Sequence, residues 1–406
     1  MITFWLCLLF FVSGVAALLF ENLWFYQTGL ALGNSVWASS LVLTGFMGGL
    51  ALGNGLAAWV AGRVRRPVRL YAGLELTIGV TGLALVLGLP FLTPVLARLF
   101  APLLDSWWIQ PLRLVCALAL LLIPATAMGA TLPVLVRALS PNDPRFGRVL
   151  GRLYGWNTFG AVVGALAGDA FLIEQVGVRG TGLVAFGLDV VAAGAALWLA
   201  RSVDAAIPAP EPDGRVAAWS RRARVALFVA ALGGFSLLAL EVVWFRFLAL
   251  FVYGTSLVFA VLLAVVLAGI GVGGLTAARW LRDGRRAAPA LPSLALASAC
   301  ATLVGYASYG AVLDAFLAPG QAAAALWHVA LLAIPLMLPL AWLSGILFTA
   351  LGEAAREQLG GEARPAGLLT LWNTVGGAVG SLVGGFVLLP RVGMEQSFLL
   401  LAASTA

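Results

Sequence analysis

The chain has 406 residues, of which 62% are hydrophobic and only 10% are charged, and its formal net charge is +7. No water-soluble globule could bury so much apolar surface, whereas a bilayer requires apolar runs of about 20 residues. The composition therefore excludes a soluble protein and predicts an all-α polytopic membrane protein.

Hydropathy predicts two groups of six membrane spans. The first group lies near 4–29, 36–61, 69–96, 113–138, 151–173 and 178–200, and the second near 225–252, 257–280, 291–313, 326–351, 367–389 and from 394 onward. We expect a first membrane repeat at 1–200, a cytoplasmic linker at 201–224 that contains IPAPEPDG, and a second repeat at 225–406. The sequence stops about 20 Å of helix after Met394, so we expect the twelfth helix to be truncated.

The arginines of the predicted loops are distributed unequally between the two sides. Because cytoplasmic loops accumulate basic residues, this distribution predicts a cytoplasmic N-terminus in a bacterial inner membrane, and it explains the basic charge without nucleic-acid binding. The predicted outer loops hold only Arg98, Arg113, Arg179 and Arg391. The predicted inner loops carry Arg63, Arg65, Arg66, Arg69, Arg137, Arg145, Arg148, Arg152, Arg201, Arg215, Arg221, Arg222, Arg224, Arg279, Arg282, Arg285, Arg286, Arg356 and Arg364.

The first span of each repeat carries a glutamate inside an apolar phrase. Leu18 to Trp24 reads LLFENLW and includes Glu21, and Leu238 to Trp244 reads LALEVVW and includes Glu241. A charge near the bilayer centre costs about 2.5 to 3.5 kcal/mol, so it requires a partner, a proton or an aqueous cavity. Because the two positions are equivalent, we expect the glutamates to face each other across a central cavity.

Arg246 breaks this symmetry, since Tyr26 occupies the corresponding place in the first repeat. Five residues correspond to about 140° of helix rotation, so Arg246 should pair across helices and not with Glu241 on its own helix. Our hypothesis is a cluster of Glu21, Arg246 and Glu241, flanked by Trp24 and Trp244, that retains negative charge for a proton or an organic cation. The alternative is a buried ion network that only fixes the packing of the two repeats.

Four other polar residues are candidates for coupling or for lining the cavity. Glu75 has no acidic counterpart in the second repeat; it is either a proton-coupling residue or, as we favour, a partner of the arginines at 63–69. Asp169 and Asp189 are weaker candidates. His328 is the only histidine, which is typical of an interfacial hydrogen-bonding residue, and the sequence offers it no partners for a metal site. We predict no cofactor.

A second phrase also occurs twice, as LYGWNTFGAVVGALAGDAFL at 153–172 and as LTLWNTVGGAVGSLVGGFVL at 369–388. Its glycines recur every four residues and form a flat stripe that favours close helix packing. Asn157 and Asn373 align and are possible cavity-lining groups. Six spans per repeat place both repeats in the same orientation, with a symmetry axis along the membrane normal, as in major-facilitator transporters.

The phrases ALLFENLW, LLALEVVWFRFL, IPATAMGATLP and LYGWNTFGAVVGAL, followed by VGVRGT, resemble the membrane portion of bacterial fused major-facilitator and spermidine-synthase-like proteins. The resemblance implies a polyamine or similar small cation as ligand and a cytoplasmic aminopropyltransferase-like domain as partner. No glycine-rich strand-to-helix turn of such a domain occurs outside the membrane spans, so we expect no enzyme in this chain. Two interpretations follow: a transporter or binding domain for a cationic solute, or a membrane anchor for a synthase-like domain or partner.

Overall fold

The computed structural model describes residues 2–32, 36–103, 106–140, 145–206, 220–253, 256–283, 287–318, 321–323, 325–360 and 363–405. Over these ranges the chain is helical, apart from loops and one isolated bridge between Val252 and Ala323. Residues 207–219 of the predicted linker lie outside the described residues, as do Arg215, Arg285 and Arg286.

Each predicted span corresponds to a helix, except that the span at 291–313 is divided at Ser308. The first repeat contains α1 (Ile2–Leu32), α2 (Val36–Val60), α3 (Pro67–Phe100), α4 (Ile109–Leu139), α5 (Phe146–Ala167), which continues as a π-helix (Gly168–Leu172), and α6 (Ile173–Val203). The second contains α7 (Arg221–Leu248), α8 (Ser256–Trp280), α9 (Leu291–Ala307), α10 (Tyr309–Phe316), α11 (Leu326–Leu359), α12 (Ala363–Val383), which continues as a π-helix (Gly384–Val392), and α13 (Met394–Thr405).

The helices have the dimensions of membrane spans. Among the described residues, ten helical stretches are long and apolar enough to cross a membrane, with α5 and α6 counted as one stretch. The helix α13 has 12 residues and is not among the ten. The chain is therefore a multi-pass membrane protein.

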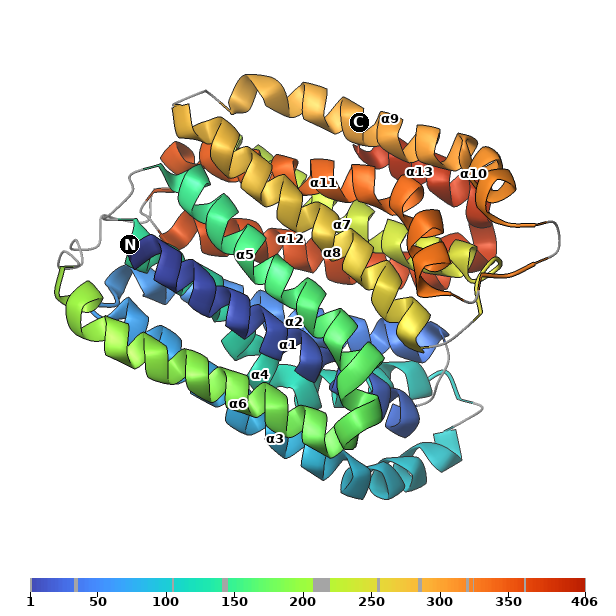
Figure 1. Cartoon of the computed structure of the whole chain (residues 1–406), viewed down its shortest axis with the longest axis horizontal. Helices are drawn as coiled ribbons and strands as arrows, with labels where there is room; N and C mark the ends of the chain where they lie inside the picture. The colour runs from blue at the N-terminus through green and yellow to red at the C-terminus, as the bar shows by residue number, and fades with distance from the viewer. Residues whose placement is uncertain are drawn as a thin grey trace.

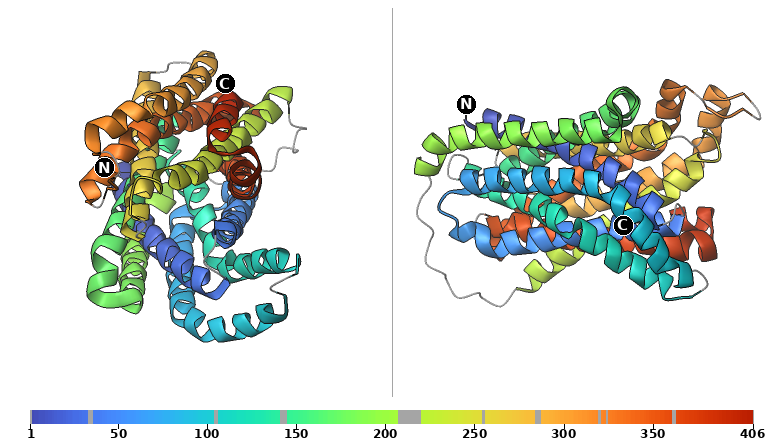
Figure 2. Two further views of the ribbon diagram at one scale, coloured as in Figure 1. Left: turned by 90° about the vertical axis from the view of Figure 1, so that its right-hand side faces the viewer. Right: turned by 90° about the horizontal axis from the view of Figure 1, so that it is seen from below.

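The two repeats lie side by side, with most of their long helices running along the long axis of the molecule (Figures 1 and 2). In Figure 1 the helices α1 to α6 occupy the lower part and α7 to α13 the upper part, and α5 lies along the boundary between them. The N-terminus of the chain and the last residues of α2 lie at the same end of the long axis. We call this the arginine-rich end, because the described residues Arg63, Arg66, Arg145, Arg279 and Arg356 gather there.

The glycine stripes form the same helix contact in both repeats. A methyl group added to Gly160 of α5 would lie 2.0 Å from the carbonyl oxygen of Phe11 on α1. The equivalent addition at Gly376 of α12 would lie 1.8 Å from the carbonyl oxygen of Ala231 on α7. Only glycine permits such close backbone approach. The predicted packing role of the stripes is confirmed, and the repeats share their packing as well as their sequence.

The turn between the fifth and sixth spans is also repeated. Gly177 has φ of 69° and Gly393 has φ of 85°. A positive φ favours glycine because a side chain would clash with the backbone. The two residues occupy equivalent places in the phrases VGV and VGM, so the sequence encodes the same break in each repeat.

The hydrophobic core joins the repeats at one end only. At the arginine-rich end a single cluster of buried residues contains Leu150 and Leu153 of α5 together with Leu351 of α11 and Leu369 of α12. Towards the other end the buried residues separate into one cluster within α1 to α6 and another within α7 to α13. The repeats are thus sealed together at the arginine-rich end and have independent cores beyond it.

Candidate functional site between the two repeats

The glutamate phrases adopt the same orientation on α1 and α7. Trp24 and Trp244 are buried in the cores of their repeats, whereas Tyr26 and Arg246 are exposed. The glutamates themselves are half-buried. Equivalent residues therefore have the same degree of burial, because α1 packs against α5 as α7 packs against α12.

Glu21 and Glu241 lie one helical turn before Phe25 and Phe245, which both contact Phe259 of α8, and the carboxylate of Glu241 acts electrostatically on that of Glu21. They reach this position from equivalent helices of opposite repeats, so the pair spans the interface between the two. Two like charges that share a half-buried site disfavour simultaneous ionisation unless a cation or a proton compensates them. This arrangement can bind positive charge.

The pair lies between two closures. On the arginine-rich side the joined core seals the interface. One helical turn beyond the glutamates, on the other side, Phe25 of α1 stacks on Phe259 of α8 with ring centroids 6.1 Å apart, and Phe259 also contacts Phe245 of α7 at 4.5 Å. Phe25 and Phe245 are equivalent residues of the two repeats. We call these three rings the aromatic bridge.

A small pocket opens beside the first glutamate. It lies between α1, α2 and α4, and apolar side chains form most of its walls. Its lining residues are Glu21, Trp24, Phe25, Val42, Leu43, Phe46 and Leu121.

Arg246 does not join the two glutamates, which contradicts the predicted cluster of two acids and one base. Its side chain is exposed, and among the described residues it forms no ion pair. The reason is the rotation of the helix: residue 246 lies about 140° from residue 241, on the face that Tyr26 occupies in the first repeat. Arg246 therefore does not neutralise the negative charge of Glu21 and Glu241.

The tryptophans pack within the repeats. Trp24 Nε1 donates a hydrogen bond to the carbonyl oxygen of Gly82 on α3 at 3.2 Å. Trp244 is equally buried, but its Nε1 has no hydrogen-bond partner among the described residues. Trp24 also lines the pocket beside Glu21.

The paired asparagines lie at helix contacts. Asn157 Nδ2 donates to the carbonyl oxygen of Phe10 on α1 at 3.0 Å. The backbone of Asn373 lies against Gly234 of α7, as that of Asn157 lies against Gly14 of α1. The contacts assign both residues to packing between helices, and they carry no evidence for the cavity-lining role.

Asp169 and His328 lie apart from each other. Asp169 accepts a hydrogen bond from Asn22 Nδ2 at 3.1 Å and so connects the π-helix after α5 to α1, beside Glu21. His328 lies in the first turn of α11, with its ring centroid 3.5 Å from that of Trp327. Within the described ranges no group of three His, Cys, Asp or Glu residues could hold a metal ion.

Glu75 lies in the interior of the first repeat, and its contacts differ from the favoured expectation of an arginine partner. Ser13 Oγ of α1 donates a hydrogen bond to Glu75 Oε1 at 2.8 Å. The other groups that act on Glu75 are Tyr71 and Asp189. The described arginines of the 63–69 cluster are not among them, because the carboxyl group faces α1 and α6 within the helix bundle.

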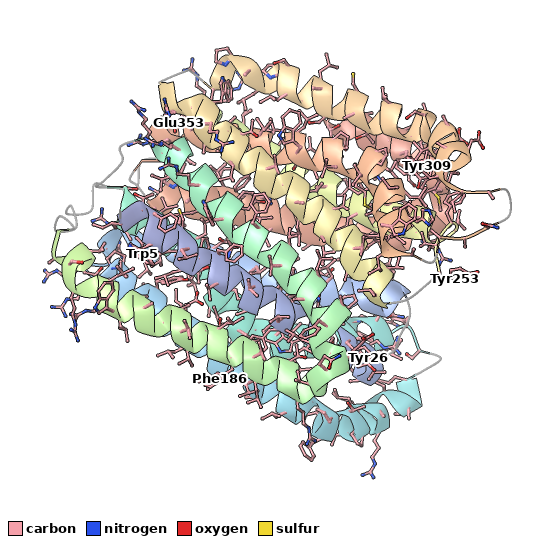
Figure 3. The ribbon with its side chains drawn as sticks, viewed as in Figure 1. Trp5, Tyr26, Phe186, Tyr253, Tyr309 and Glu353 are labelled. Atoms are coloured by element: carbon pink, nitrogen blue, oxygen red, sulfur yellow. The ribbon has the colours of Figure 1, made fainter. Side chains whose placement is uncertain are left out.

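Sequence reasoning missed the aromatic bridge and the polar contacts at the arginine-rich end. The repeat did contain a signal for the bridge, since Phe25 and Phe245 each follow the aligned tryptophan. At the arginine-rich end, Glu353 of α11 accepts a hydrogen bond from the backbone N–H of Gly147 on α5. Figure 3 shows Glu353 and Trp5 at this end and Tyr26, Tyr253 and Tyr309 towards the other.

No family model matches this chain, and no curated protein matches it. Among solved structures, the E. coli fucose:proton symporter FucP is similar with a TM-score of 0.63 and 15% identity, over 99% of this chain and 95% of that one. A bacterial homologue of the iron transporter ferroportin, in an outward-facing state, has a TM-score of 0.61 and 13% identity, over 100% and 96%. The POT family transporter PepTSo has a TM-score of 0.56 and 14% identity, over 98% and 95%. The chain therefore has the two-repeat, major-facilitator-type fold of these membrane transporters.

Proposed function

We propose that this protein is a transporter that moves a small organic cation, of the polyamine class, through a site between its two repeats. Glu21 and Glu241 bind the ammonium groups of the solute. The observation that carries the proposal is the position of the two carboxylates on equivalent helices of opposite repeats, one turn from Phe25 and Phe245, which meet on Phe259.

The charge of the site supports a cation as the solute. Two carboxylates that repel each other lose that unfavourable energy when positive charge lies between them, and the effect is larger in a half-buried site than in water. Arg246 does not supply this charge. The rings of Phe25 and Phe245 add faces on which an alkylammonium group can lie. The resemblance of the sequence to spermidine-synthase-linked membrane domains favours a polyamine over other cations.

The two closures around the glutamates support transport by alternating access. The joined core at the arginine-rich end and the aromatic bridge on the other side each separate the glutamate pair from one end of the molecule. Opening one closure at a time would expose the site to one side of the membrane and then to the other. The similar structures are described as a symporter and as transporters, and we extend that activity to this chain as part of the proposal.

Spermidine binding to the full chain in lipid nanodiscs, measured by titration calorimetry, tests the proposal. We expect saturable binding that falls about tenfold or more in Glu21→Gln and in Glu241→Gln, because each substitution removes a charge worth at least about 1.4 kcal/mol to the bound polycation. Glu174→Gln is the matched control, since Glu174 is an exposed glutamate at the end of the first repeat opposite the arginine-rich end.

Uptake of labelled spermidine into proteoliposomes then separates binding from transport. We expect flux in the parent and in Glu174→Gln, and little in the two site variants. Saturable binding without flux would contradict transport. Absence of binding for several organic cations would contradict the site itself and would favour the other interpretation, a membrane anchor for a cytoplasmic synthase-like domain or partner.

We also propose that the arginine-rich end faces the cytoplasm of a bacterial inner membrane. The arginines of the predicted inner loops support this orientation. A reporter fused after Val203, which fluoresces only in the cytoplasm, should be bright, whereas one inserted after Leu103 should be dark. The reverse pattern would overturn the orientation without affecting the fold.

A further inference from the structure

A second pair of acidic residues lies inside the first repeat, away from the glutamates of the interface. Glu75 on α3 is 0% exposed and Asp189 on α6 is 1% exposed. Ser13 of α1 and Tyr71 of α3 complete the polar surroundings, at 5% and 0% exposure. Four polar side chains are thus enclosed where α1, α3 and α6 meet.

The contacts place the two carboxyl groups together. Asp189 lies against α3 one turn beyond Glu75, since a methyl group added at Gly79 would lie 3.1 Å from Asp189 Cβ and 3.3 Å from its Oδ2. The carboxyl groups of Asp189 and Glu75 are therefore neighbours and act on each other electrostatically. The absence of a side chain at Gly79 provides the space for this approach.

Three of the four carboxyl oxygens lack a hydrogen-bond donor. Ser13 Oγ donates to Glu75 Oε1, but Glu75 Oε2 and both oxygens of Asp189 are buried and have no partner among the described residues. The Tyr71 hydroxyl donates to the carbonyl oxygen of Leu9, at 3.4 Å, and not to either acid. Burying a carboxylate without hydrogen-bond donors costs free energy, so this pair requires one further donor.

No described cation supplies that group. The side chains that act on the pair come from α1 (Ser13), from α3 (Tyr71) and from the two acids themselves. Within the described residues, α4 also packs on α3 but presents no charged or titratable group to the pair. Two ionised carboxylates side by side in an apolar interior would repel each other strongly, whereas one proton between them makes one group a donor and the other its acceptor.

We propose that Glu75 and Asp189 form a proton-binding site in the first repeat, in which the two carboxyl groups share one exchangeable proton. The proton occupies the place of the missing donor and leaves the pair with a single negative charge. The bond is an ordinary O–H to one carboxyl oxygen, and release of the proton to water regenerates the two carboxylates.

The position of the site connects it to the solute site. Ser13 and Glu21 both lie on α1, eight residues apart, which is about 12 Å along the axis and about 80° around it. One helix therefore contacts the proton site through Ser13 and the solute site through Glu21. The second repeat has Ala295 in the region that corresponds to Glu75, so the site belongs to one repeat only. This coupling rests on the proposed function, whereas the proton site itself does not.

Infrared difference spectroscopy of the full chain in nanodiscs, combined with proton counting in a pH jump, tests the site. The background variant Glu21→Gln/Glu241→Gln removes the carboxyls of the interface from the signal. In that background we expect a protonated-carboxyl band and the release of one proton per chain as the pH rises. Both should be lost in Glu75→Gln and in Asp189→Asn. These variants should fold, because an amide N–H donates the hydrogen bond that the acid proton otherwise supplies.

Asp314→Asn is the control, since Asp314 is exposed on α10; it should leave the band and the proton count unchanged. If Glu75→Gln and Asp189→Asn also leave both unchanged, the proposal is overturned. Proton release that requires sodium chloride and is absent with potassium chloride would also overturn it, in favour of a sodium site.

The coupling is tested in the parent protein by adding spermidine at fixed pH. A change in the protonated-carboxyl band that is absent in Asp189→Asn supports coupling to the solute site. A band that titrates normally but does not respond to spermidine overturns the coupling and leaves the proton site intact. Failure of spermidine to bind at all would be seen independently by calorimetry.

Discussion

Glu353 of α11 accepts a hydrogen bond from the backbone N–H of Gly147 in the first turn of α5, so a side chain of the second repeat caps a helix of the first. Free N–H groups at a helix N-terminus favour a negatively charged acceptor. Beside this contact, the guanidinium of Arg145 donates to the carbonyl oxygen of Arg282, in the short 3-10 helix Leu281–Asp283 that follows α8. Polar contacts between the repeats thus reinforce the joined core at the arginine-rich end.

We expect Glu353→Ala to weaken the closure of this end. Loss of a helix cap costs about 1 kcal/mol, which corresponds to roughly a fivefold change in the ratio of closed to open molecules. Spin labels at Trp59 of α2 and Arg279 of α8, in a background without the native cysteines, report the separation of the repeats there. Pulsed dipolar spectroscopy should show a larger population at long distances in Glu353→Ala.

Glu353→Gln should have an intermediate effect, because an amide oxygen still accepts the hydrogen bond but carries no charge. Glu174→Ala, at the other end of the molecule, should leave the distances unchanged. Identical distance distributions in the parent and in Glu353→Ala would show that the joined core alone holds this end closed.

Repeat symmetry predicts that Glu21 and Glu241 face each other, because equivalent residues on equivalent helices are related by the axis between the repeats. The prediction that Arg246 joins them was wrong, since its side chain is exposed. An unmatched residue has no symmetry constraint, and hydropathy alone does not distinguish the inward face of a helix from its outward face. The glycine stripes were recognised as packing surfaces, but a GxxxG pattern specifies a flat face and not the helix that covers it.

The partner of Glu75 was not predictable in the same way. Asp189 lies on α6, far along the chain, and neither residue has a counterpart in the second repeat. We expected an arginine partner because the arginines at 63–69 are close to Glu75 in the sequence. The neighbour that Glu75 has in the structure, Asp189, is determined by how α3 packs on α6. Two unmatched acids in the same repeat were the available signal, since each needs a partner inside the membrane.

We expect Phe259→Ala to open the side of the site opposite the arginine-rich end. Phe259 contacts Phe25 and Phe245, and each aromatic contact contributes about 0.5 to 1.5 kcal/mol. A cysteine at Leu43, which lines the pocket beside Glu21, should then react roughly ten times faster with a membrane-impermeant thiol reagent added on that side.

The matched control for this prediction is Phe228→Ala, because Phe228 is an exposed aromatic residue of α7 near the arginine-rich end. It should leave the reaction rate unchanged. An unchanged rate in Phe259→Ala would mean that the aromatic bridge does not restrict access to the pocket.

Gly160→Ala and Gly376→Ala should destabilise the protein by similar amounts. The added methyl group would meet a backbone carbonyl oxygen at 2.0 Å or 1.8 Å, so the helices must separate, and overpacking of this kind costs about 1 to 3 kcal/mol. Thermal unfolding in detergent should show a lower midpoint for both. Gly187→Ala on α6 is the control, since its methyl group meets nothing within 4 Å and alanine favours the helix. A loss of stability in only one of the two stripe variants would show that the repeats do not depend equally on this contact.

The carboxyl group of Asp204 should make the stability of the protein depend on pH. Asp204 follows α6 and caps the start of α3, where its carboxylate accepts hydrogen bonds from the backbone N–H groups of Val68 at 3.0 Å and Arg69 at 3.2 Å. Burial raises the pKa of Asp204, although these two N–H groups and the charges of Arg69 and Arg66 act to lower it. The folded protein therefore holds this proton up to a higher pH than the unfolded chain does.

It follows that the contribution of Asp204 to stability is greatest below the ordinary pKa of an aspartate and declines as the pH rises through the folded-state pKa. Residue 204 cannot titrate in Asp204→Asn, so the unfolding midpoint of this variant should lack the decline. The midpoint of the parent should therefore fall relative to that of the variant as the pH rises. Thermal unfolding measured in parallel across the acidic range checks the sign. A parent that gains stability relative to the variant over the same range would show that the two backbone N–H groups outweigh burial at this cap.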